Sequence, residues 1–280
     1  MTDHAPETLL FVHIPKAAGT TLGRVMERHV PAARHYRLGA NAQADIERFN
    51  QLPESQRARY LLISGHFPYG VHEQVPNPCA YFTVLRDPVD RVTSFYHFVK
   101  AQPGHDLNET LTPSQKDSLL DFSRTTFWPI VDNGQTRQLA GDWGRVPFGH
   151  CDRDMLETAK RNLASFAVVG LTERFNATLL LLGQRFGWSR LGYRTVNQTR
   201  NRPPVDALSA ATRSALEDLN ELDQELYAFA RELFEDQWAA SGLDDTHFME
   251  HHPPPTKARD FISRITSRNA ADWKRKLKRG

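Results

Sequence analysis

The chain has 280 residues and a formal net charge of +2, and its content of 40% hydrophobic and 24% charged residues is ordinary for a soluble globular protein. The charge is unevenly distributed. Residues 256–280 contain nine Lys or Arg and two Asp or Glu, a net of +7, so the other 255 residues sum to −5. Because the basic character belongs to the tail, the body of the chain is not expected to bind nucleic acid.

The cysteine content and the apolar stretches exclude several other classes of protein. Cys79 and Cys151 lie far apart, with neither a disulfide framework nor CxxC metal spacing. No apolar stretch approaches the roughly 20 residues of a transmembrane helix, and the N-terminus lacks the pattern of a signal peptide. We therefore expect a cytoplasmic protein in a reducing compartment.

Strand patterns alternate with helix patterns along most of the chain. Apolar runs predict strands at residues 9–14, 60–64, 80–85 and 166–170. Apolar periodicity predicts helices at 19–29, 42–52, from 88 to about 99, at 113–127, 153–164, 172–186, 208–219 and 221–240, with a short polar helix or turn at 133–141 and loops at 101–112 and 192–204. This order predicts an α/β fold, P-loop-like and three-layered, with a central, mainly parallel sheet flanked by helices. We expect one domain over residues 1–255 and a basic tail over 256–280.

The segment Leu9–Thr21, LLFVHIPKAAGTT, has the layout of a buried strand, a tight loop and a helix N-terminus. Backbone N–H groups, the Lys16 ammonium and the threonine hydroxyls are groups that bind an anion. The loop differs from the GxxxxGK[ST] loop of ATPases, because Lys16 precedes Gly19 by three residues. An ordinary strand-to-helix turn remains an equal alternative for this segment taken alone.

Arg86 and Ser94 form a second candidate phosphate site. Arg86 follows a predicted strand, and Asp87 and Pro88 have the pattern of a helix N-cap and first helical position. On that helix Ser94 lies nearly opposite the apolar stripe, so we expect its hydroxyl to point away from the core. The alternative is a surface ion pair of Arg86 with Asp87 or Asp90, beside a solvated serine.

Together these segments resemble the family 2 sulfotransferases, whose donor is 3′-phosphoadenosine 5′-phosphosulfate (PAPS). HIPKAAGTTL is similar to their 5′-phosphosulfate-binding segment, and LRDPVDRVTSFYHF to their 3′-phosphate-binding segment. The pattern resembles most the glycosaminoglycan uronosyl 2-O-sulfotransferase branch, although Ser64 replaces the first histidine of a pair and Ala17 replaces the usual threonine. Animal members of that branch are Golgi membrane proteins, and the lack of an anchor here suggests a bacterial cytoplasmic protein.

The resemblance implies roles for individual residues. Lys16 would neutralise charge on the oxygen that bridges phosphate and sulfate, and Arg86 and Ser94 would bind the 3′-phosphate. The loop around Tyr193–Arg202 is a weaker candidate for the 3′-phosphate or adenine. The 5′-phosphate would be cradled by Lys16, Ala17, Ala18, Gly19, Thr20 and Thr21. No metal is required for this chemistry.

His66 is the candidate base, because sulfuryl transfer needs a group that accepts the proton of the acceptor hydroxyl. It follows Gly65 at the end of a predicted strand, and the family resemblance indicates the same residue; the alternative is a histidine that caps a strand end. His13 is a competitor, but its place inside an apolar strand indicates a core histidine.

Three polar residues of the 133–141 segment are candidates for contact with the acceptor or the donor sulfate: Asn133, Gln135 and Arg137. A polar surface turn is an equal alternative. His247, Glu250 and His251 match the HxxEH zinc pattern, but the prolines that follow would break the supporting helix, so we expect no metal there.

The sequence thus predicts a PAPS-dependent sulfotransferase that acts on a hydroxyl, with a carbohydrate as the expected partner. The alternatives are a P-loop nucleotide kinase or NTPase, against which the position of Lys16 argues, and a non-catalytic nucleotide- or glycan-binding relative. For the tail we expect a solvated segment, with contact to an anionic polysaccharide or an acidic membrane surface as alternatives. The acceptor and the oligomeric state do not follow from the sequence.

Overall fold

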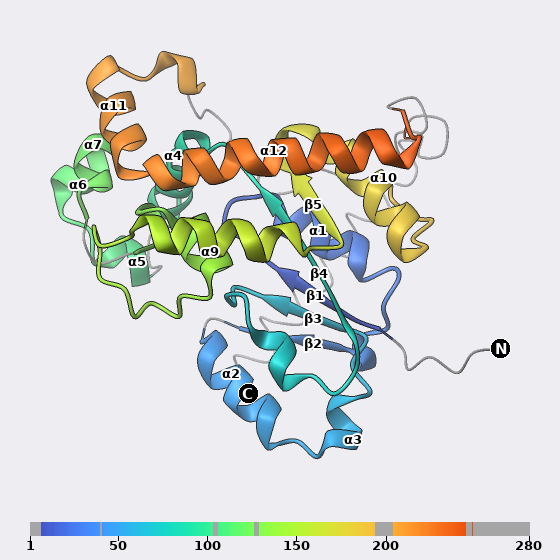
Figure 1. Cartoon of the computed structure of the whole chain (residues 1–280). Helices are drawn as coiled ribbons and strands as arrows, with labels where there is room; N and C mark the ends of the chain where they lie inside the picture. The colour runs from blue at the N-terminus through green and yellow to red at the C-terminus, as the bar shows by residue number, and fades with distance from the viewer. Residues whose placement is uncertain are drawn as a thin grey trace, which may run out of the picture.

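The computed structural model describes residues 7–39, 41–102, 106–125, 129–193, 204–244 and 248. Its centre is a five-stranded sheet in which all neighbouring strands are parallel and the order is β2-β3-β1-β4-β5 (Figure 1). The strands are β1 Thr8–Val12, β2 His35–Arg37, β3 Leu62–Gly65, β4 Cys79–Leu85 and β5 Val168–Leu171. The prediction of an α/β fold with a parallel sheet is confirmed.

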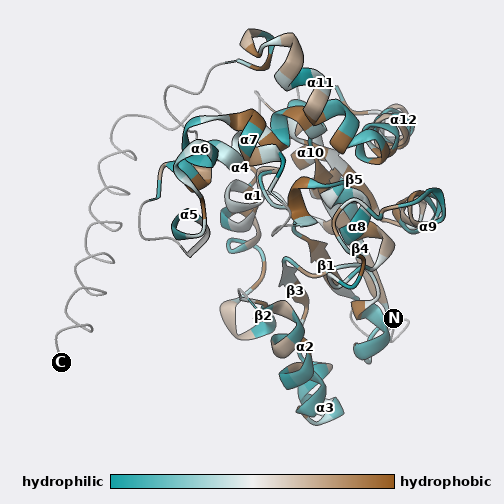
Figure 2. Cartoon of the chain, turned by 90° about the vertical axis from the view of Figure 1, so that its left-hand side faces the viewer, coloured by the Kyte–Doolittle hydropathy of each residue, from teal (hydrophilic) through white to brown (hydrophobic). Residues whose placement is uncertain are grey.

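Helices cover both faces of this sheet. They are α1 Gly19–Met26, α2 Ala42–Gln51, α3 Glu54–Arg57, α4 Pro88–Lys100, α5 Asp106–Glu109, α6 Pro113–Asp117, α7 Leu119–Ser123, α8 Gly134–Ala140, α9 Arg153–Ala164, α10 Phe175–Phe186, α11 Ala210–Leu219 and α12 Glu221–Ser241. Figure 2 shows α9 and α12 on one side of the sheet and α1 on the other. The expected three-layer arrangement is therefore present.

The central strand β1 is buried along its whole length. All five residues of TLLFV are buried, as expected for a parallel strand covered on both faces. On one face, Phe11 stacks on Phe82 of β4 at 5.0 Å between ring centroids, and Phe82 contacts Phe186 of α10 at 5.4 Å. This packing holds β1 rigidly, and so it also fixes the start of the loop that follows.

Strand β2 was missed by the sequence analysis. It pairs with β3, with His35 opposite Leu62 and Arg37 opposite Ser64. Its three residues, His-Tyr-Arg, have no apolar run, because an edge strand is covered less completely than a central one. Its place in the sheet depends on the neighbouring β3 and not on a local pattern.

Several predicted boundaries were wrong for local reasons. The helix expected over 113–127 is two short helices, because Ser118 is extended and its side chain caps α7 by accepting from Asp121 N. The expected loop at 101–112 contains α5. Thr172 does not cap the next helix: its hydroxyl donates to Leu85 O at 3.0 Å, and α10 begins only at Phe175. Within the described part of the chain, no helix has both the length and the apolar character needed to cross a membrane.

Candidate active site

The candidate residues lie at one edge of the sheet, where three adjacent strands end. The loop with Lys16 follows β1, His66 follows β3 and Arg86 follows β4. The register places Val12 opposite both Gly65 and Thr83, so β1 and β3 end at the same level and β4 continues to Leu85. Ligands of open α/β sheets characteristically bind at this edge. The fold thus brings together three segments that are separated by up to 70 residues in sequence.

The loop after β1 has an unusual backbone. Lys16 and Ala18 both adopt positive φ angles, 69° and 58°, which is uncommon for residues other than glycine. Ala18 is the N-cap of α1 and provides no side-chain cap. Thr21 N donates to Ala18 O at 3.0 Å, so in the described part of the chain the amides of Gly19 and Thr20 are left for another acceptor. A helix N-terminus of this kind binds anions through its N–H groups and its dipole. Thr20 is exposed beside it, whereas Thr21 is buried.

Arg86 is fixed between α4 and this loop. Its Nε and Nη2 atoms donate to Asp90 Oδ2 at 2.8 and 2.5 Å, and Nη1 donates to the carbonyl oxygen of Lys16 at 2.8 Å. The Asp90 ion pair that we considered as an alternative is present, but its side chains are only 16% and 20% exposed. These bonds use three of the five N–H donors of a guanidinium. Arg86 is therefore oriented in advance for a further anion.

A row of α4 residues faces the same loop. Asp90, Ser94 and Phe98 follow one another at intervals of four residues, which places them on one side of a helix. Asp90 contacts Arg86, and the Lys16 ammonium lies 4.0 Å from the centre of the Phe98 ring. Ser94 lies between these contacts and is only 7% exposed, so the side of α4 opposite its apolar stripe is covered at Ser94. The helix α4 packs against α5, α7, α11 and α12.

His66 is held by the backbone of the neighbouring strand end. Its Nδ1 atom lies 2.7 Å from the carbonyl oxygen of His13, and a carbonyl can only accept. Nδ1 therefore carries the proton of the neutral ring, and Nε2 is left as the acceptor. The residue reaches solvent on one side, but desolvation by the protein on the other side lowers the pKa of His66, with the bond to His13 opposing that shift. His66 is thus a neutral ring with a basic nitrogen at neutral pH.

His13 is not the enclosed core histidine that we expected. It follows β1, is half-buried, and its ring lies 4.2 Å from the ring of His66, centroid to centroid. Burial, together with the positive charges of His66 and Lys16, lowers the pKa of His13 to about 3. Gly19 is required beside it, because a Cβ there would come within 1.9 Å of His13 Nε2. The first turn of α1 therefore rests directly on the His13 ring.

A cavity of about 150 Å³ opens at this end of the sheet beside α1. His13 and His66 line it together with Ser64, His35 and Arg37. Its remaining walls come from α1, the ends of β1 and β3 and the residue after β2: Phe11, Gly19, Gly23, Met26, Glu27, Leu38 and Gly65. His66 thus borders a cavity that has room for a small polar group or for part of a larger molecule.

The candidate acceptor residues of α8 are engaged inside the protein. Asn133, Gln135 and Arg137 are 7%, 0% and 4% exposed, so the surface turn considered as an alternative is wrong. Gln135 Nε2 donates to Arg86 O at 2.9 Å and its Oε1 accepts from Arg86 N at 3.1 Å. Arg137 forms ion pairs with Asp132 and Asp142 at 2.5 and 3.1 Å. These bonds favour a structural role, in which Gln135 holds the backbone of Arg86.

Asp223 of α12 supports this arrangement and was not singled out by sequence. Its carboxylate accepts from Gln135 N at 3.1 Å and Thr136 N at 2.7 Å, and it faces the buried guanidinium of Arg91 at 3.4 Å. Asn133 Oδ1 in turn accepts from Asp223 N at 3.0 Å. A single acidic residue in an amphipathic helix forms no sequence pattern that would predict this supporting role. His35 was missed because it lies in β2, whose three residues contain no apolar run.

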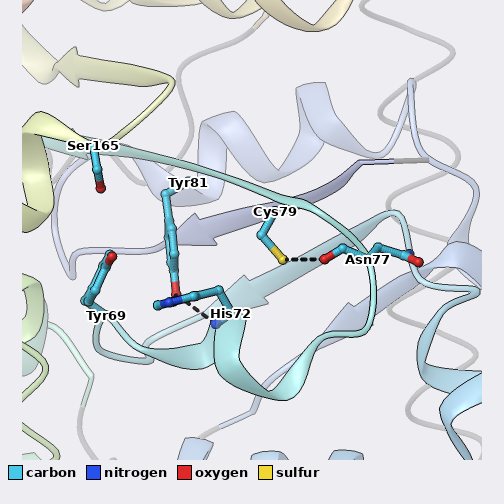
Figure 3. A pocket seen from close by; sticks show the side chains of 6 residues that line it. All are labelled: Tyr69, His72, Asn77, Cys79, Tyr81 and Ser165. Atoms are coloured by element: carbon cyan, nitrogen blue, oxygen red, sulfur yellow. Dashed lines mark hydrogen bonds between the residues drawn. The ribbon is translucent and has the colours of Figure 1, made fainter. Parts of the chain in front are cut away.

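A larger cavity, about 290 Å³, lies at the amino-terminal end of β4, away from the carboxyl ends of the strands where the candidate residues lie (Figure 3). Tyr81 of β4 stacks there with Tyr69 and Phe166 at 4.8 and 5.1 Å between ring centroids, and its hydroxyl accepts from His72 N at 3.0 Å. Burial raises the pKa of Cys79 to about 11, which keeps this thiol protonated at neutral pH. The remaining labelled residues, Asn77 and Ser165, complete the lining. Three of its lining residues are Tyr69, His72 and Tyr81, and it contains none of the residues that the sequence analysis singled out as candidates for the site.

Several sequence predictions fall on residues outside the described part of the chain. They concern most of the 192–204 loop, the HxxEH pattern at His247, Glu250 and His251, and the basic tail 256–280. Among the described residues, no group of three or more His, Cys, Asp or Glu is placed to hold a metal ion.

Comparison with known proteins decides the family. Residues 2–230 match the model of the family described as "Sulfotransferase family". The chain belongs to the sulfotransferase family. The match covers the loop of Lys16, His66, Arg86 and the supporting helices up to about the first half of α12.

Curated relatives of this family member include human heparan-sulfate 6-O-sulfotransferases. The chain is 26% identical to human heparan-sulfate 6-O-sulfotransferase 1 over 282 residues, covering 83% of this chain and 66% of the relative. It is 25% identical to human heparan-sulfate 6-O-sulfotransferase 3 over 280 residues, covering 83% of this chain and 58% of the relative. The chain thus spans less than two thirds of their length. These comparisons support the family and not the 2-O-sulfotransferase branch specifically.

Among solved structures, mouse sulfotransferase SULT7A1 complexed with PAP matches with a TM-score of 0.38 and 16% sequence identity, over 76% of this chain and 65% of that one. A likeness of this extent supports no comparison of individual residues.

Proposed function

We propose that this member of the sulfotransferase family transfers a sulfuryl group from PAPS to a hydroxyl of a carbohydrate. The observation that carries the proposal is the meeting of Lys16, His66 and Arg86 at the carboxyl ends of three adjacent strands, beside the uncapped N-terminus of α1. A lysine, an arginine and a helix N-terminus suit a donor with two phosphate groups. A neutral imidazole beside them suits the activation of a hydroxyl.

In the proposed reaction the acceptor hydroxyl gives its proton to Nε2 of His66. Its oxygen forms a bond to sulfur while the bond between sulfur and the bridging phosphate oxygen breaks. The electron pair of that bond stays on the 5′-phosphate of the product, adenosine 3′,5′-bisphosphate (PAP). Lys16 and the amides of Ala18, Gly19 and Thr20, with the Thr20 and Thr21 hydroxyls, stabilise the charge that develops there; the Ala17 amide instead donates to Ile14 O at 3.2 Å. By analogy with phosphoryl transfer, positioning and charge stabilisation supply most of the rate.

Arg86 and Ser94 are proposed to bind the 3′-phosphate. Arg86 keeps its bonds to Asp90 and to the carbonyl oxygen of Lys16 while its other N–H groups bind phosphate oxygens. Ser94 lies one helical turn beyond Asp90 on α4. Because Arg86 also donates to the carbonyl oxygen of Lys16, binding of the 3′-phosphate at Arg86 affects the position of the loop that binds the 5′-phosphosulfate. The fit needs no metal ion.

The acceptor class is inferred from the relatives. The proteins that align with 83% of this chain carry names that describe sulfation of heparan sulfate, a polysaccharide with many hydroxyl groups. We therefore propose a glycan acceptor, with the 6-O position of a heparan-like chain to be tested first and the 2-O position second.

The proposal is tested with the full chain in two steps. Isothermal titration with PAP in the presence of EDTA is expected to give a dissociation constant at the micromolar level or better. Incubation with [³⁵S]PAPS and heparan sulfate is then expected to label the polysaccharide, and disaccharide analysis identifies the labelled position. No PAP binding, either with EDTA or in a second titration with magnesium, or equal binding of PAP and Mg-ATP in that second buffer, would refute the donor assignment. PAP binding without labelling would refute the acceptor class alone.

A further inference from the structure

A chain of polar side chains reaches the first cavity from the edge strand β2. We propose that Ser64 binds the acceptor beside His66, and that His35 and Arg37 position the Ser64 hydroxyl as a hydrogen-bond donor toward that acceptor. This inference rests on the proposed function and adds to it a binding residue and two positioning residues. Ser64, His35, Arg37 and His66 all line the same cavity of about 150 Å³.

The sheet register brings these residues to one face. Arg37 is directly opposite Ser64, and Ser64 is opposite Phe11 of β1, on the face that also carries His13. His35 precedes Arg37 by two residues and so points to the same side. Its Nε2 atom lies 2.7 Å from Ser64 Oγ. The contact spans two strands and therefore depends on the pairing of β2 with β3.

The direction of these hydrogen bonds follows from the chemistry of arginine. Arg37 Nε lies 3.0 Å from His35 Nδ1, and a guanidinium can only donate. Nδ1 of His35 must therefore be the unprotonated nitrogen. Burial and the neighbouring Arg37 charge lower the pKa of His35 to about 4, so the ring is neutral at neutral pH. Its one proton lies on Nε2 and is donated to Ser64 Oγ.

Because Ser64 Oγ accepts from His35, its own proton is directed to a different acceptor. A sugar offers such acceptors in its hydroxyl and ring oxygens. A bond from Ser64 to one of them would hold the neighbouring hydroxyl near Nε2 of His66, two residues further along the chain. Glu27 closes this chain of contacts by pairing with Arg37 at 2.8 Å, where both side chains are about half exposed. Arg37 is thereby kept in the orientation that selects the His35 tautomer.

The decisive variants are Ser64→Ala, Ser64→Thr, Arg37→Met and the double variant Ser64→Ala/Arg37→Met, with Ser165→Ala as the matched control. Ser165 is exposed at the end of α9 and bonds only locally, donating to Asn162 O at 2.6 Å. Loss of one hydrogen bond to the acceptor is expected to lower kcat/KM for heparan sulfate roughly 3- to 10-fold, mainly through KM. Ser64→Thr retains most of the activity, and Ser165→Ala behaves as the wild type.

Two further measurements separate positioning from simple structural damage. The PAP dissociation constant and the melting temperature are expected to stay close to wild type in Ser64→Ala. Adding Arg37→Met to Ser64→Ala should cause little further loss of kcat/KM, since Arg37 acts through Ser64. In ¹⁵N-histidine-labelled protein at neutral pH, NMR is expected to show His35 with a protonated Nε2 and an unprotonated Nδ1.

The outcomes distinguish this inference from the function on which it rests. If the wild type binds no PAP or labels no glycan, the proposed function has failed and this inference falls with it. If the wild type labels heparan sulfate and Ser64→Ala does so with unchanged kcat/KM, only the inference is refuted. A proton on His35 Nδ1, or fully additive losses in the double variant, would refute the positioning by His35 and Arg37.

Discussion

The Nδ1 atom of His66 donates a hydrogen bond of 2.7 Å to the carbonyl oxygen of His13. This bond links the end of β3 to the end of β1, the strand that leads into the Lys16 loop. It sets the tautomer of His66 and leaves Nε2 as the basic atom in the cavity. The proposed base and the proposed donor loop are therefore oriented by the same strand end.

Replacing His66 tests its assignment as the base. In His66→Ala the acceptor hydroxyl would lose its proton acceptor, so kcat for sulfate transfer is expected to fall roughly 10²- to 10⁴-fold. PAP binding should be nearly unchanged, because the donor groups come from the loop after β1 and from Arg86. Radiolabelled transfer and titration calorimetry measure the two quantities. A variant with wild-type kcat would show that another group takes the proton.

The pH dependence of kcat/KM tests the protonation state of the same residue. Desolvation lowers the pKa of His66 below its ordinary value of 6.5, and the pKa of His13 is lowered to about 3. The rate requires neutral His66, so it should be constant around neutral pH and fall as pH decreases, with a midpoint below 6.5. Initial rates from about pH 8 to pH 5 measure this midpoint. A midpoint at or above 6.5 would contradict the expected environment of His66.

The same histidines also predict how stability changes with pH. A histidine whose pKa is lower in the folded protein than in the unfolded chain makes its full contribution to stability at pH values above its unfolded-state pKa. That contribution is lost as the pH falls from about 6.5 toward the folded values, about 3 for His13 and about 4 for His35. The rate profile should therefore be recorded only where circular dichroism shows folded protein.

Arg86 is expected to discriminate PAP from AMP, which lacks the 3′-phosphate. Removing a charged hydrogen-bond donor in Arg86→Ala should weaken PAP binding roughly 10- to 100-fold and affect AMP much less. Arg153→Ala is the control, because Arg153 is exposed and pairs only with Glu221 and Glu225 on the surface among the described residues. Calorimetric titration of both nucleotides against both variants gives the comparison. Equal losses of affinity for PAP and AMP would refute the assignment of Arg86 to the 3′-phosphate site.

Two glycines of α1 form a matched pair for stability. A Cβ at Gly19 would lie 1.9 Å from His13 Nε2, whereas a Cβ at Gly23 meets nothing within 4 Å. Gly19→Ala is therefore expected to lower the free energy of unfolding by roughly 1–3 kcal/mol, and Gly23→Ala to raise it by roughly 0.5–1 kcal/mol. Urea denaturation measures both. Similar effects of the two substitutions would show that α1 does not rest on His13.

The buried pair of Asp223 and Arg91 is expected to be sensitive to the loss of one charge. Their side chains are 0% and 1% exposed, so Asp223→Asn would leave the Arg91 charge buried without its carboxylate. We expect a loss of roughly 3–5 kcal/mol in the free energy of unfolding. Asp236→Asn, an exposed position on the same helix, should change it little. A small effect at Asp223 would mean that water or another acidic group compensates Arg91.

Much of the sheet could be predicted because its central strands are encoded by local patterns. Apolar runs predicted β1, β3, β4 and β5 to within a few residues, and Asp87 and Pro88 indicated the start of α4, where Asp87 does accept from Asp90 N. The order of the strands was not predicted and comes from the structure. β2 could not be found in this way, since its three polar residues are a strand only through their bonds to β3.

For the candidate site, the sequence by itself determined which segments belong together. Lys16, His66 and Arg86 each come within two residues of the end of a predicted strand, and residues at the ends of parallel strands meet at one edge whatever the details of packing. The tertiary structure alone decided what these groups do to one another. It fixed the His66 tautomer through His13, oriented Arg86 with Asp90 and the Lys16 carbonyl, buried Ser94 and joined His35 to Ser64. Those contacts join residues distant in sequence, or depend on backbone angles that no local pattern encodes.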